Sequence, residues 1–312
     1  MKTLNLPPPP RGYAPYAALV TPARARPELW RLVLGLAICE AVFALAIYGF
    51  DEGIAWISPA LADRIYRGDT PLGLILQLLS YGFLGLAAIF VTEKLHDRQA
   101  GDLFGPRGGN RWWLRRAFGG AMLFYVVIQF LPPWTDLEAL EQIRNPLAWM
   151  LTLPFGLLAL LVQCGSEELL YRGYLQSQIA ARFDNPAVWM VLPNLAFAAV
   201  HWSEGATWSE NWQYVIWAFC FGLACSDLVA RSGRLVTAIG LHVANNTFAF
   251  VFFGEVRGMD SGLALFLFPE VPDLPDAPGG GDPGGPILTA QLLMELVVLA
   301  LAWLSARVAV RR

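Results

Sequence analysis

Charged residues are scarce in this sequence. Lys, Arg, Asp and Glu make up 15% of its 312 residues, and hydrophobic residues make up 56%. Soluble domains carry about 25% charged residues, so the composition excludes an ordinary soluble domain. The net charge of −3, with its basic residues scattered, argues against a nucleic-acid-binding surface. We therefore expect a polytopic membrane protein whose surroundings are the lipid bilayer and which has no nucleic-acid partner.

Several marks of hydrolytic and redox chemistry are also missing. The sequence contains neither the His-Glu-x-x-His zinc motif nor a Gly-x-Ser-x-Gly nucleophile elbow. It has only four cysteines and no Cys-x-x-Cys spacing. All four lie in or beside apolar segments, which predicts small core residues without a redox role; they are Cys39, Cys164, Cys220 and Cys225.

Long apolar runs dominate what is present. Windows long enough to cross roughly 30 Å of hydrocarbon occupy about 31–50, 72–92, 117–134, 147–165, 186–203, 212–230, 235–254 and 287–306. These runs predict an all-α polytopic membrane protein of about eight transmembrane helices. The first run follows a Pro-rich, Arg-bearing tail and is long enough to span, so we expect it to remain as an anchor rather than a cleaved signal.

The basic residues indicate an orientation. Most of the 22 Lys and Arg residues fall within 2–31, 94–116, 182, 231–234 and 307–312, all on one predicted side. The opposite side has only Arg64, Arg67, Arg144 and Arg257. Because cytoplasmic flanks carry the positive excess, we predict that both termini are cytoplasmic and that the protein resides in the plasma (cytoplasmic) membrane.

Proline-rich segments set the predicted domain boundaries. Residues 1–28 are expected to form a disordered cytoplasmic tail, and residues 29–312 a single transmembrane domain. The Gly- and Pro-rich stretch from Pro269 to Pro286 separates the last two predicted helices and cannot form a packed core. Polar clusters within apolar segments all lie between 163 and 246, which places the functional core at about 147–254.

The first polar cluster is Glu167-Glu168-Leu-Leu-Tyr-Arg172, at the end of an apolar run. Residues four apart share one face of a helix, so Glu168 is predicted to pair with Arg172 while Glu167 points elsewhere. Glu168 would then stay ionised, and Glu167 would be free to act as a general base. The simpler interpretation is a structural ion pair beside a solvated Glu167.

Two further clusters repeat this spacing. Phe197 and His201 lie four apart on one predicted helix, and His242 and Asn246 on another. Each cluster alone is typical of ordinary interhelical hydrogen bonding. However, two of the three histidines fall in these clusters, which favours one shared buried site. The third, His96, lies in a basic loop and is predicted to be a surface residue.

These residue types suit peptide hydrolysis. A carboxylate with an imidazole deprotonates water, and an imidazole with an Asn amide stabilises the oxyanion of a tetrahedral intermediate. The set Glu167, His201 and His242 equally matches the ligands of a catalytic zinc ion, Zn²⁺, with an open position. Both a metal-free water and a zinc-bound water remain candidates at this stage.

The ordered set resembles the three motifs of the CPBP intramembrane proteases. Glu-Glu-x-x-x-Arg-Gly at 167–173, Phe-x-x-x-His at 197–201 and His-x-x-x-Asn at 242–246 carry the resemblance. Phe221-Gly222 and the run Arg231 to Leu235 extend it, so that it covers about 160–250. The family includes type II CAAX prenyl endopeptidases and bacterial abortive-infection and bacteriocin-processing or immunity proteins.

This resemblance implies an all-helical fold with an intramembrane active-site cavity. It implies that Glu167 activates the water with help from His201, that His242 and Asn246 form the oxyanion site, and that Glu168 and Arg172 shape it. The expected activity is endoproteolysis of a membrane-anchored substrate of the prenylated CAAX type. No motif position departs from the pattern, whereas the loops around it differ, which leaves the substrate open.

Two other classes of function compete with the protease. A non-catalytic membrane partner, such as an immunity or regulatory protein, would keep the fold, but it would not need all six polar residues. A transporter would show discontinuous helices in symmetric halves, and the sequence shows no such repeat.

The predicted helix boundaries conflict with a shared site. They put Glu167 near the cytoplasmic end of its helix and His201 near the opposite end of the next one. Either the first helix begins earlier than its apolar window or the second is tilted and offset.

Overall fold

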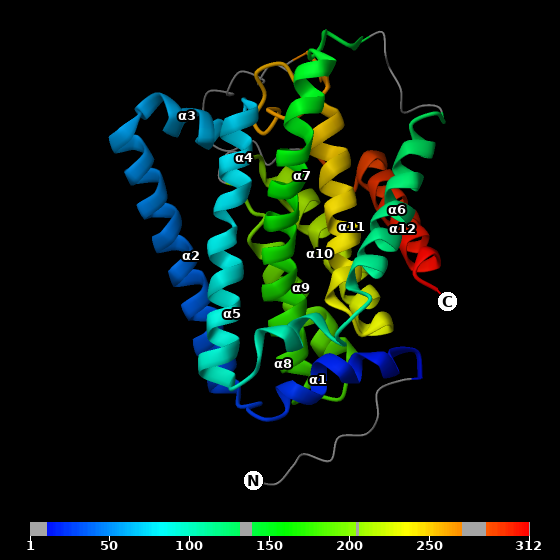
Figure 1. Cartoon of the computed structure of the whole chain (residues 1–312). Coiled ribbons are helices and arrows are strands. Elements are labelled where there is room, and N and C mark those ends of the chain that lie inside the picture. Colours follow the sequence, from blue (N-terminus) through cyan, green and yellow to red (C-terminus); the bar gives the residue numbers. More distant parts are fainter. Residues whose placement is uncertain (1–10, 132–138, 204–205, 270–284, 312) are drawn as a thin grey trace.

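The computed structural model describes residues 11–131, 139–203, 206–269 and 285–311, and helices dominate it (Figure 1). The long helices run up and down through one bundle. Their bounds are α2 Leu29–Ile57, α4 Pro71–Ser80, α5 Gly82–His96, α6 Asn110–Ile128, α7 Pro146–Glu168, α9 Pro186–Ala199, α10 Trp208–Ser232, α11 Leu235–Thr247 and α12 Ala290–Ala309. Shorter helical pieces are η1 Arg11–Tyr16, α1 Ala17–Ala23, α3 Pro59–Arg67, η2 Ala100–Phe104 and α8 Ser177–Ala180.

Each of the eight apolar windows coincides with a helix, which confirms a polytopic all-α membrane protein. Within the described residues, six helices are long and apolar enough to cross a membrane. The prediction of about eight exceeds this number for two reasons. The helix α9 has only 14 residues, fewer than the roughly 20 that a span needs, and α6 carries Arg111, Arg115 and Arg116 in its first turns.

Four helices begin with the same local signal. A Ser, Thr or Asn side chain accepts a backbone N–H of the first turn, and a proline follows directly. Such a side chain satisfies an otherwise unpaired N–H, and proline suits the first helical position because its missing N–H is not needed there. The pairs are Ser58-Pro59, Thr70-Pro71, Asn145-Pro146 and Asn185-Pro186.

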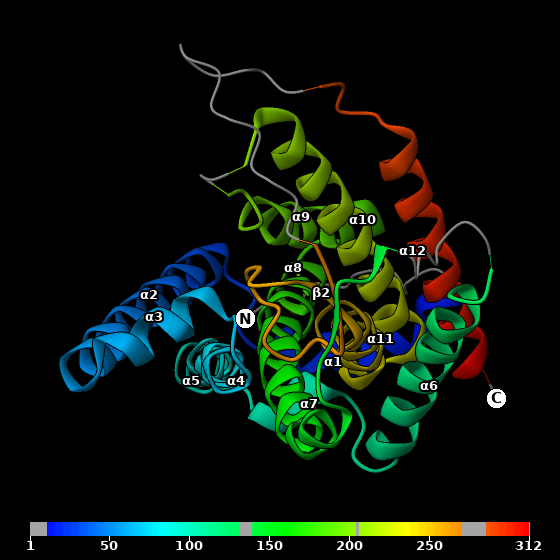
Figure 2. The ribbon, with the colours of Figure 1, turned by 90° about the horizontal axis from the view of Figure 1, so that it is seen from above.

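The helix α11 lies at the centre of the bundle. Figure 2 shows it surrounded by α6, α7 and α10, and 72% of its apolar window is buried. It continues as a π-helix, η5 Phe248–Phe252. A small sheet follows at this end, where β3 (Phe266–Phe268) pairs antiparallel with β1 (Gln142–Ile143) and parallel with β2 (Phe253–Glu255). The sheet ties the ends of α7 and α11 together.

The prediction of a disordered tail over residues 1–28 is wrong for residues 11–23. These residues form η1 and α1, and their side chains pack into the bundle. The Tyr13 hydroxyl donates to Asp227 at 2.9 Å, the Tyr16 ring lies 5.0 Å from that of Trp189, and Leu19 is fully buried. The aromatic and aliphatic residues of the segment 11–23 pack against the bundle and bury it, although the segment contains prolines. Residues 1–10, and most of the predicted loop at 269–286, lie outside the described residues.

The prediction that His96 is a surface residue is also wrong. It ends α5 and is fully buried. One ring nitrogen contacts the Tyr174 hydroxyl at 2.8 Å, and the other contacts the backbone carbonyl of Arg26 at 2.9 Å. The neighbouring basic residues gave no sign of this burial, because the helix end is covered by the N-terminal segment and by the π-helix η4 (Leu169–Gln176).

Candidate active site

The helix α7 continues beyond its apolar window instead of ending there. It passes into a π-helical segment, η4 (Leu169–Gln176), and then into α8, so that Pro146–Ala180 is one apolar helix of 35 residues. Glu167 and Glu168 therefore lie far from either end of this helix. The sequence suggested that this helix starts earlier or that the next helix is tilted and offset. The structure shows instead that the helix continues at its C-terminal end, beyond Glu168. The polar residues of the extension are buried, and the apolar window missed them.

Glu168 lies at the centre of a buried ionic cluster. Its Oε1 accepts a hydrogen bond from Arg172 Nη1 at 3.0 Å and contacts His242 Nδ1 at 2.9 Å. Glu168 and Arg172 are both fully buried, so the charges are shielded from solvent. The predicted pairing of Glu168 with Arg172 is present, and a histidine from another helix joins it.

The other end of the Arg172 guanidinium reaches α9. Its Nη2 donates to Asn194 Oδ1 at 3.1 Å, and Asn194 Nδ2 in turn donates to Ser226 Oγ on α10 at 2.8 Å. Gly222 makes this approach feasible. A Cβ there would overlap Asn194 Oδ1 and would lie 2.9 Å from Arg172 Nη2. The Phe-Gly pair of the sequence thus leaves room for a guanidinium between helices.

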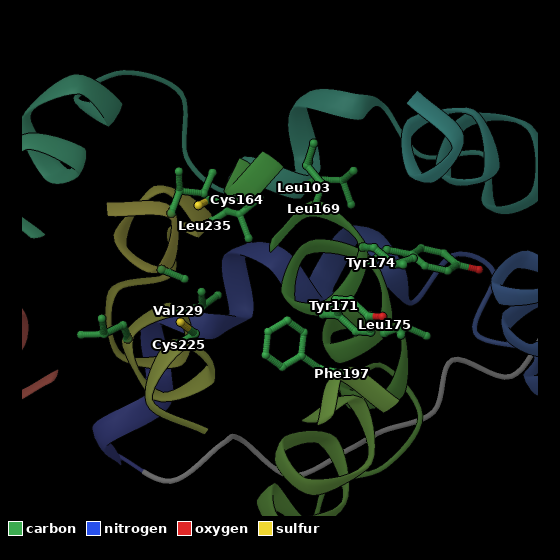
Figure 3. Close-up of a cluster of buried hydrophobic side chains, with 14 of the residues drawn as sticks. Leu103, Cys164, Leu169, Tyr171, Tyr174, Leu175, Phe197, Cys225, Val229 and Leu235 are labelled. Atoms are coloured by element: carbon green, nitrogen blue, oxygen red, sulfur yellow. The ribbon is translucent and has the colours of Figure 1, made fainter. Parts of the chain in front are cut away.

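The Phe197 ring packs between Arg172 and the two histidines His201 and His242. The Arg172 guanidinium lies 4.4 Å from its ring centroid, and the rings of His201 and His242 lie at 4.6 and 6.3 Å. Figure 3 shows Phe197 beside Tyr171 in the surrounding hydrophobic cluster, with their centroids 5.1 Å apart. The Phe-x-x-x-His spacing therefore supplies both an imidazole and the aromatic ring on which the other groups pack.

Glu167 has different partners from Glu168. One carboxylate oxygen, Oε1, accepts a hydrogen bond from Gln163 Nε2 at 2.6 Å. The other, Oε2, lies 3.7 Å from His242 Nε2, which is beyond normal hydrogen-bonding distance. Gln163 also accepts a hydrogen bond from Asn246 Nδ2 at 2.9 Å. Gln163 thus joins Glu167 on α7 to Asn246 on α11.

The hydrogen-bond partners of His201 and His242 assign both rings to the tautomer with the hydrogen on Nδ1. His201 Nδ1 lies 2.7 Å from the backbone carbonyl of Phe197, which only accepts, so Nδ1 carries the hydrogen. His242 Nδ1 faces the Glu168 carboxylate in the same way. When the rings are neutral, each Nε2 is then a lone-pair acceptor.

The structure brings the six predicted site residues into one region of the bundle. Five of them are linked by hydrogen bonds or ionic contacts, directly or through Gln163. The sixth, His201, packs against Phe197. Sequence reasoning missed Gln163 and Asn194. The only signal for Gln163 was its position one turn before Glu167, and Asn194 offered nothing beyond a polar residue in an apolar helix.

The arrangement of these residues does not fit a zinc ion. Among the described residues, no group of three His, Cys, Asp or Glu side chains lies close enough to hold a metal. His242 Nε2 and Glu167 Oε2 face each other at 3.7 Å, but His201 does not complete a set of three with them. The geometry does not support the metalloprotease prediction, and we derive no step through a metal.

The chain is similar to known proteins over the region that carries this site. The chain is 24% identical over 262 residues to the uncharacterized protein YyaK of Bacillus subtilis (strain 168), covering 79% of this chain and 85% of YyaK. No solved structure matches. Residues 149–248 match the family model described as type II CAAX prenyl endopeptidase Rce1-like, and all six predicted site residues lie within this range. The part of the chain that carries the site is therefore similar to the Rce1-like type II CAAX prenyl endopeptidases.

Proposed function

We propose that the protein is an intramembrane endopeptidase in which Glu167 activates the attacking water. The observation that carries this proposal is the unequal environment of the two adjacent glutamates. The Glu168 side chain is fully buried, and its Oε1 is bound by both Arg172 and His242. The Glu167 side chain is 12% exposed, and among the described residues its one hydrogen bond comes from the neutral amide of Gln163. An accessible carboxylate without a cationic partner within hydrogen-bonding distance can take a proton from water, whereas a buried carboxylate held by Arg172 and His242 stays ionised and serves as an anchor.

The hydrolysis needs a proton to move twice. Glu167 Oε2 would take a proton from water as the oxygen attacks the peptide carbonyl carbon, and would return it to the leaving amine nitrogen when the C–N bond breaks. His201 would orient the water, because its Nε2 is an acceptor for a water hydrogen. The ring packing of His201 on Phe197 holds that nitrogen in place.

The oxyanion of the intermediate would be stabilised by Asn246 and His242. Asn246 donates one amide hydrogen to Gln163 and has a second for the oxyanion. His242 can donate from Nε2 only when doubly protonated, because its Nδ1 hydrogen points at Glu168; the Glu168 carboxylate would then offset the added positive charge. One such donor contributes roughly 10²–10³ in rate.

The proposed substrate is a membrane-anchored peptide of the prenylated CAAX type. The match of residues 149–248 to the Rce1-like family model and the apolar surroundings of the site support it, since a lipid anchor would deliver the peptide to a site within the bilayer. The test is hydrolysis by purified protein of matched peptides with and without a prenyl group, with the Glu167→Gln variant as control. Cleavage of neither peptide, or equal cleavage by the variant, would contradict the proposal.

We further propose that both termini face the cytoplasm of a plasma membrane protein. The basic residues support this orientation, because most Lys and Arg residues lie in the segments predicted to be cytoplasmic, which include the connection from α5 to α6. Reporter fusions at Arg107 and at Arg144 should therefore report opposite sides, with Arg107 cytoplasmic. The reverse assignment would overturn the orientation without affecting the proposed chemistry.

A further inference from the structure

A pocket of about 400 Å³ lies away from the candidate active site, at the end of the bundle where α10 and α12 finish. Its walls come from η1, α6, α10 and α12, and its lining includes Trp113, Arg231, Arg307 and Arg311. Arg231 follows Gly222 by nine residues on α10, about 13 Å along the axis. The pocket is therefore a separate site from the cluster around Arg172.

One of the three arginines is already neutralised. Arg231 Nε lies 2.8 Å from both carboxylate oxygens of Asp227. Asp227 also accepts hydrogen bonds from the Tyr13 hydroxyl at 2.9 Å and from Trp303 Nε1 at 3.1 Å. Asp227 is 8% exposed. Both of its carboxylate oxygens already accept hydrogen bonds from these three side chains, so Asp227 does not neutralise a second arginine.

The other two arginines have no such partner. Among the described residues, no carboxylate forms an ion pair with Arg307 or Arg311. Both line the pocket, Arg307 in the last turn of α12 and Arg311 two residues beyond its end, and the Arg307 guanidinium lies 5.1 Å from the centroid of the Trp303 ring. Within the described residues the pocket thus has two positive charges without a carboxylate partner, a combination that matches the bidentate recognition of phosphate.

The neighbouring surface indicates where such a phosphate would come from. The adjacent face of α12 carries the exposed apolar side chains Leu301, Leu304 and Val308, at 42, 41 and 55% exposure. Because α12 is long and apolar enough to cross a membrane, we expect these exposed side chains to face hydrocarbon. Buried Leu228 and Val310 form apolar walls within the pocket itself. A ligand with an anionic head and an acyl tail would satisfy both surfaces, which free phosphate would not.

We propose that this pocket binds the phosphate of an anionic phospholipid through Arg307 and Arg311. The acyl chains would lie along the exposed face of α12. The lipid would join the N-terminal segment to the last helix, because η1 and α12 form facing walls. Basic pockets between membrane helices recognise anionic headgroups by the same combination of charge and apolar surface. This inference does not depend on the proposed protease activity.

The test compares thermal unfolding midpoints of the purified protein in phosphatidylcholine, in phosphatidylcholine with phosphatidylglycerol, and in phosphatidylcholine with inorganic phosphate. A ligand that binds only the folded state raises the midpoint. We expect phosphatidylglycerol to raise the wild-type midpoint by a few degrees and to leave Arg307→Gln/Arg311→Gln unchanged. The matched control is Arg111→Gln/Arg115→Gln, an exposed pair with the same spacing on α6 outside the pocket lining, which should respond like the wild type.

Each alternative outcome has a defined meaning. An equal rise with inorganic phosphate would overturn the lipid assignment, and an equal phosphatidylglycerol effect in both double variants would overturn the site. If Arg307→Gln/Arg311→Gln gives no cooperative transition, the single variant Arg311→Gln, at an exposed position, replaces it. Anionic lipid extracted from the purified protein should fall at least several-fold in the pocket variant, and undiminished anionic lipid there would contradict the proposal.

Discussion

His242 is held by Glu168 through Nδ1, at a distance of 2.9 Å. This contact fixes the orientation of the imidazole and turns its second nitrogen away from the ion pair. That second nitrogen, Nε2, is the one nearest to the adjacent carboxylate of Glu167, at 3.7 Å. Two neighbouring glutamates thus contact opposite sides of one histidine, one as an anchor and the other across a gap.

Replacing Glu167 with Gln should abolish peptide hydrolysis and leave the protein folded and membrane-inserted. The amide keeps the size of the side chain and can still bond to Gln163, but it cannot take a proton from water. The measurement is turnover of the prenylated peptide, with the thermal midpoint as the check on folding. Wild-type turnover by this variant would contradict the role of Glu167 as the general base.

Replacing Glu168 with Gln should reduce both activity and stability. It leaves the buried Arg172 without a counter-charge, which we expect to cost about 3 kcal/mol. Asp63→Asn is the matched control, since Asp63 pairs with Arg67 at 2.8 Å and the same spacing, but on the surface. Its effect should stay below about 0.5 kcal/mol. Equal thermal midpoints for the two variants would show that the buried pair contributes no more than an exposed one.

Gln163 is expected to position Glu167 and Asn246 without touching the substrate. Gln163→Met keeps the length of the side chain and removes both hydrogen bonds, so kcat should fall by roughly 10²-fold while KM changes little. Gln291→Met is the control, because Gln291 bonds to Glu295 at 3.1 Å with the same spacing on α12. A rise in KM at unchanged kcat would assign Gln163 to substrate binding instead.

Gly222 should not tolerate a methyl group. Gly222→Ala would push the Cβ into Asn194 and against the Arg172 guanidinium, which should cost about 1–3 kcal/mol of stability and lower activity. Gly119→Ala, at a helical position with nothing within 4 Å of the added Cβ, should instead stabilise by up to about 1 kcal/mol. The two thermal midpoints should therefore move in opposite directions, and a shared direction would refute the packing argument.

Activity should not require a bound metal. The described residues offer two facing donors, Glu167 and His242, rather than three that converge. We expect protein prepared without metal to keep its turnover and to be insensitive to chelator, with metal content far below one ion per chain. Stoichiometric zinc that is lost together with activity and restored with it would overturn this expectation.

The local part of the site was predictable from the sequence because it depends on spacing along one helix. The four-residue separation of Glu168 and Arg172 sets their contact whatever surrounds them. The contact of Glu168 with His242 depends instead on the relative height and rotation of α7 and α11. No single-sequence pattern encodes that register, so the sequence indicated a shared site without its connections.

Two misjudgements have one physical cause. Hydropathy windows end where polar residues begin, so the extension of α7 through η4 to Ala180 and the burial of His96 both escaped prediction. In both places the polar groups are buried beside other polar groups, such as Arg172 with Glu168 and His96 with Tyr174. Burial of paired polar residues is a property of the assembled bundle, and composition alone does not reveal it.

The packing of the N-terminal segment has a consequence for the order of biosynthesis. The Tyr13 side chain bonds to Asp227, 214 positions later in the chain, and Tyr16 packs on Trp189. Residues 11–23 leave the ribosome well before α9 and α10, yet their binding surfaces exist only after those two helices have been translated and inserted. This segment therefore stays undocked until α9 and α10 have been synthesised. Its docking is expected to be one of the last steps in the assembly of the bundle.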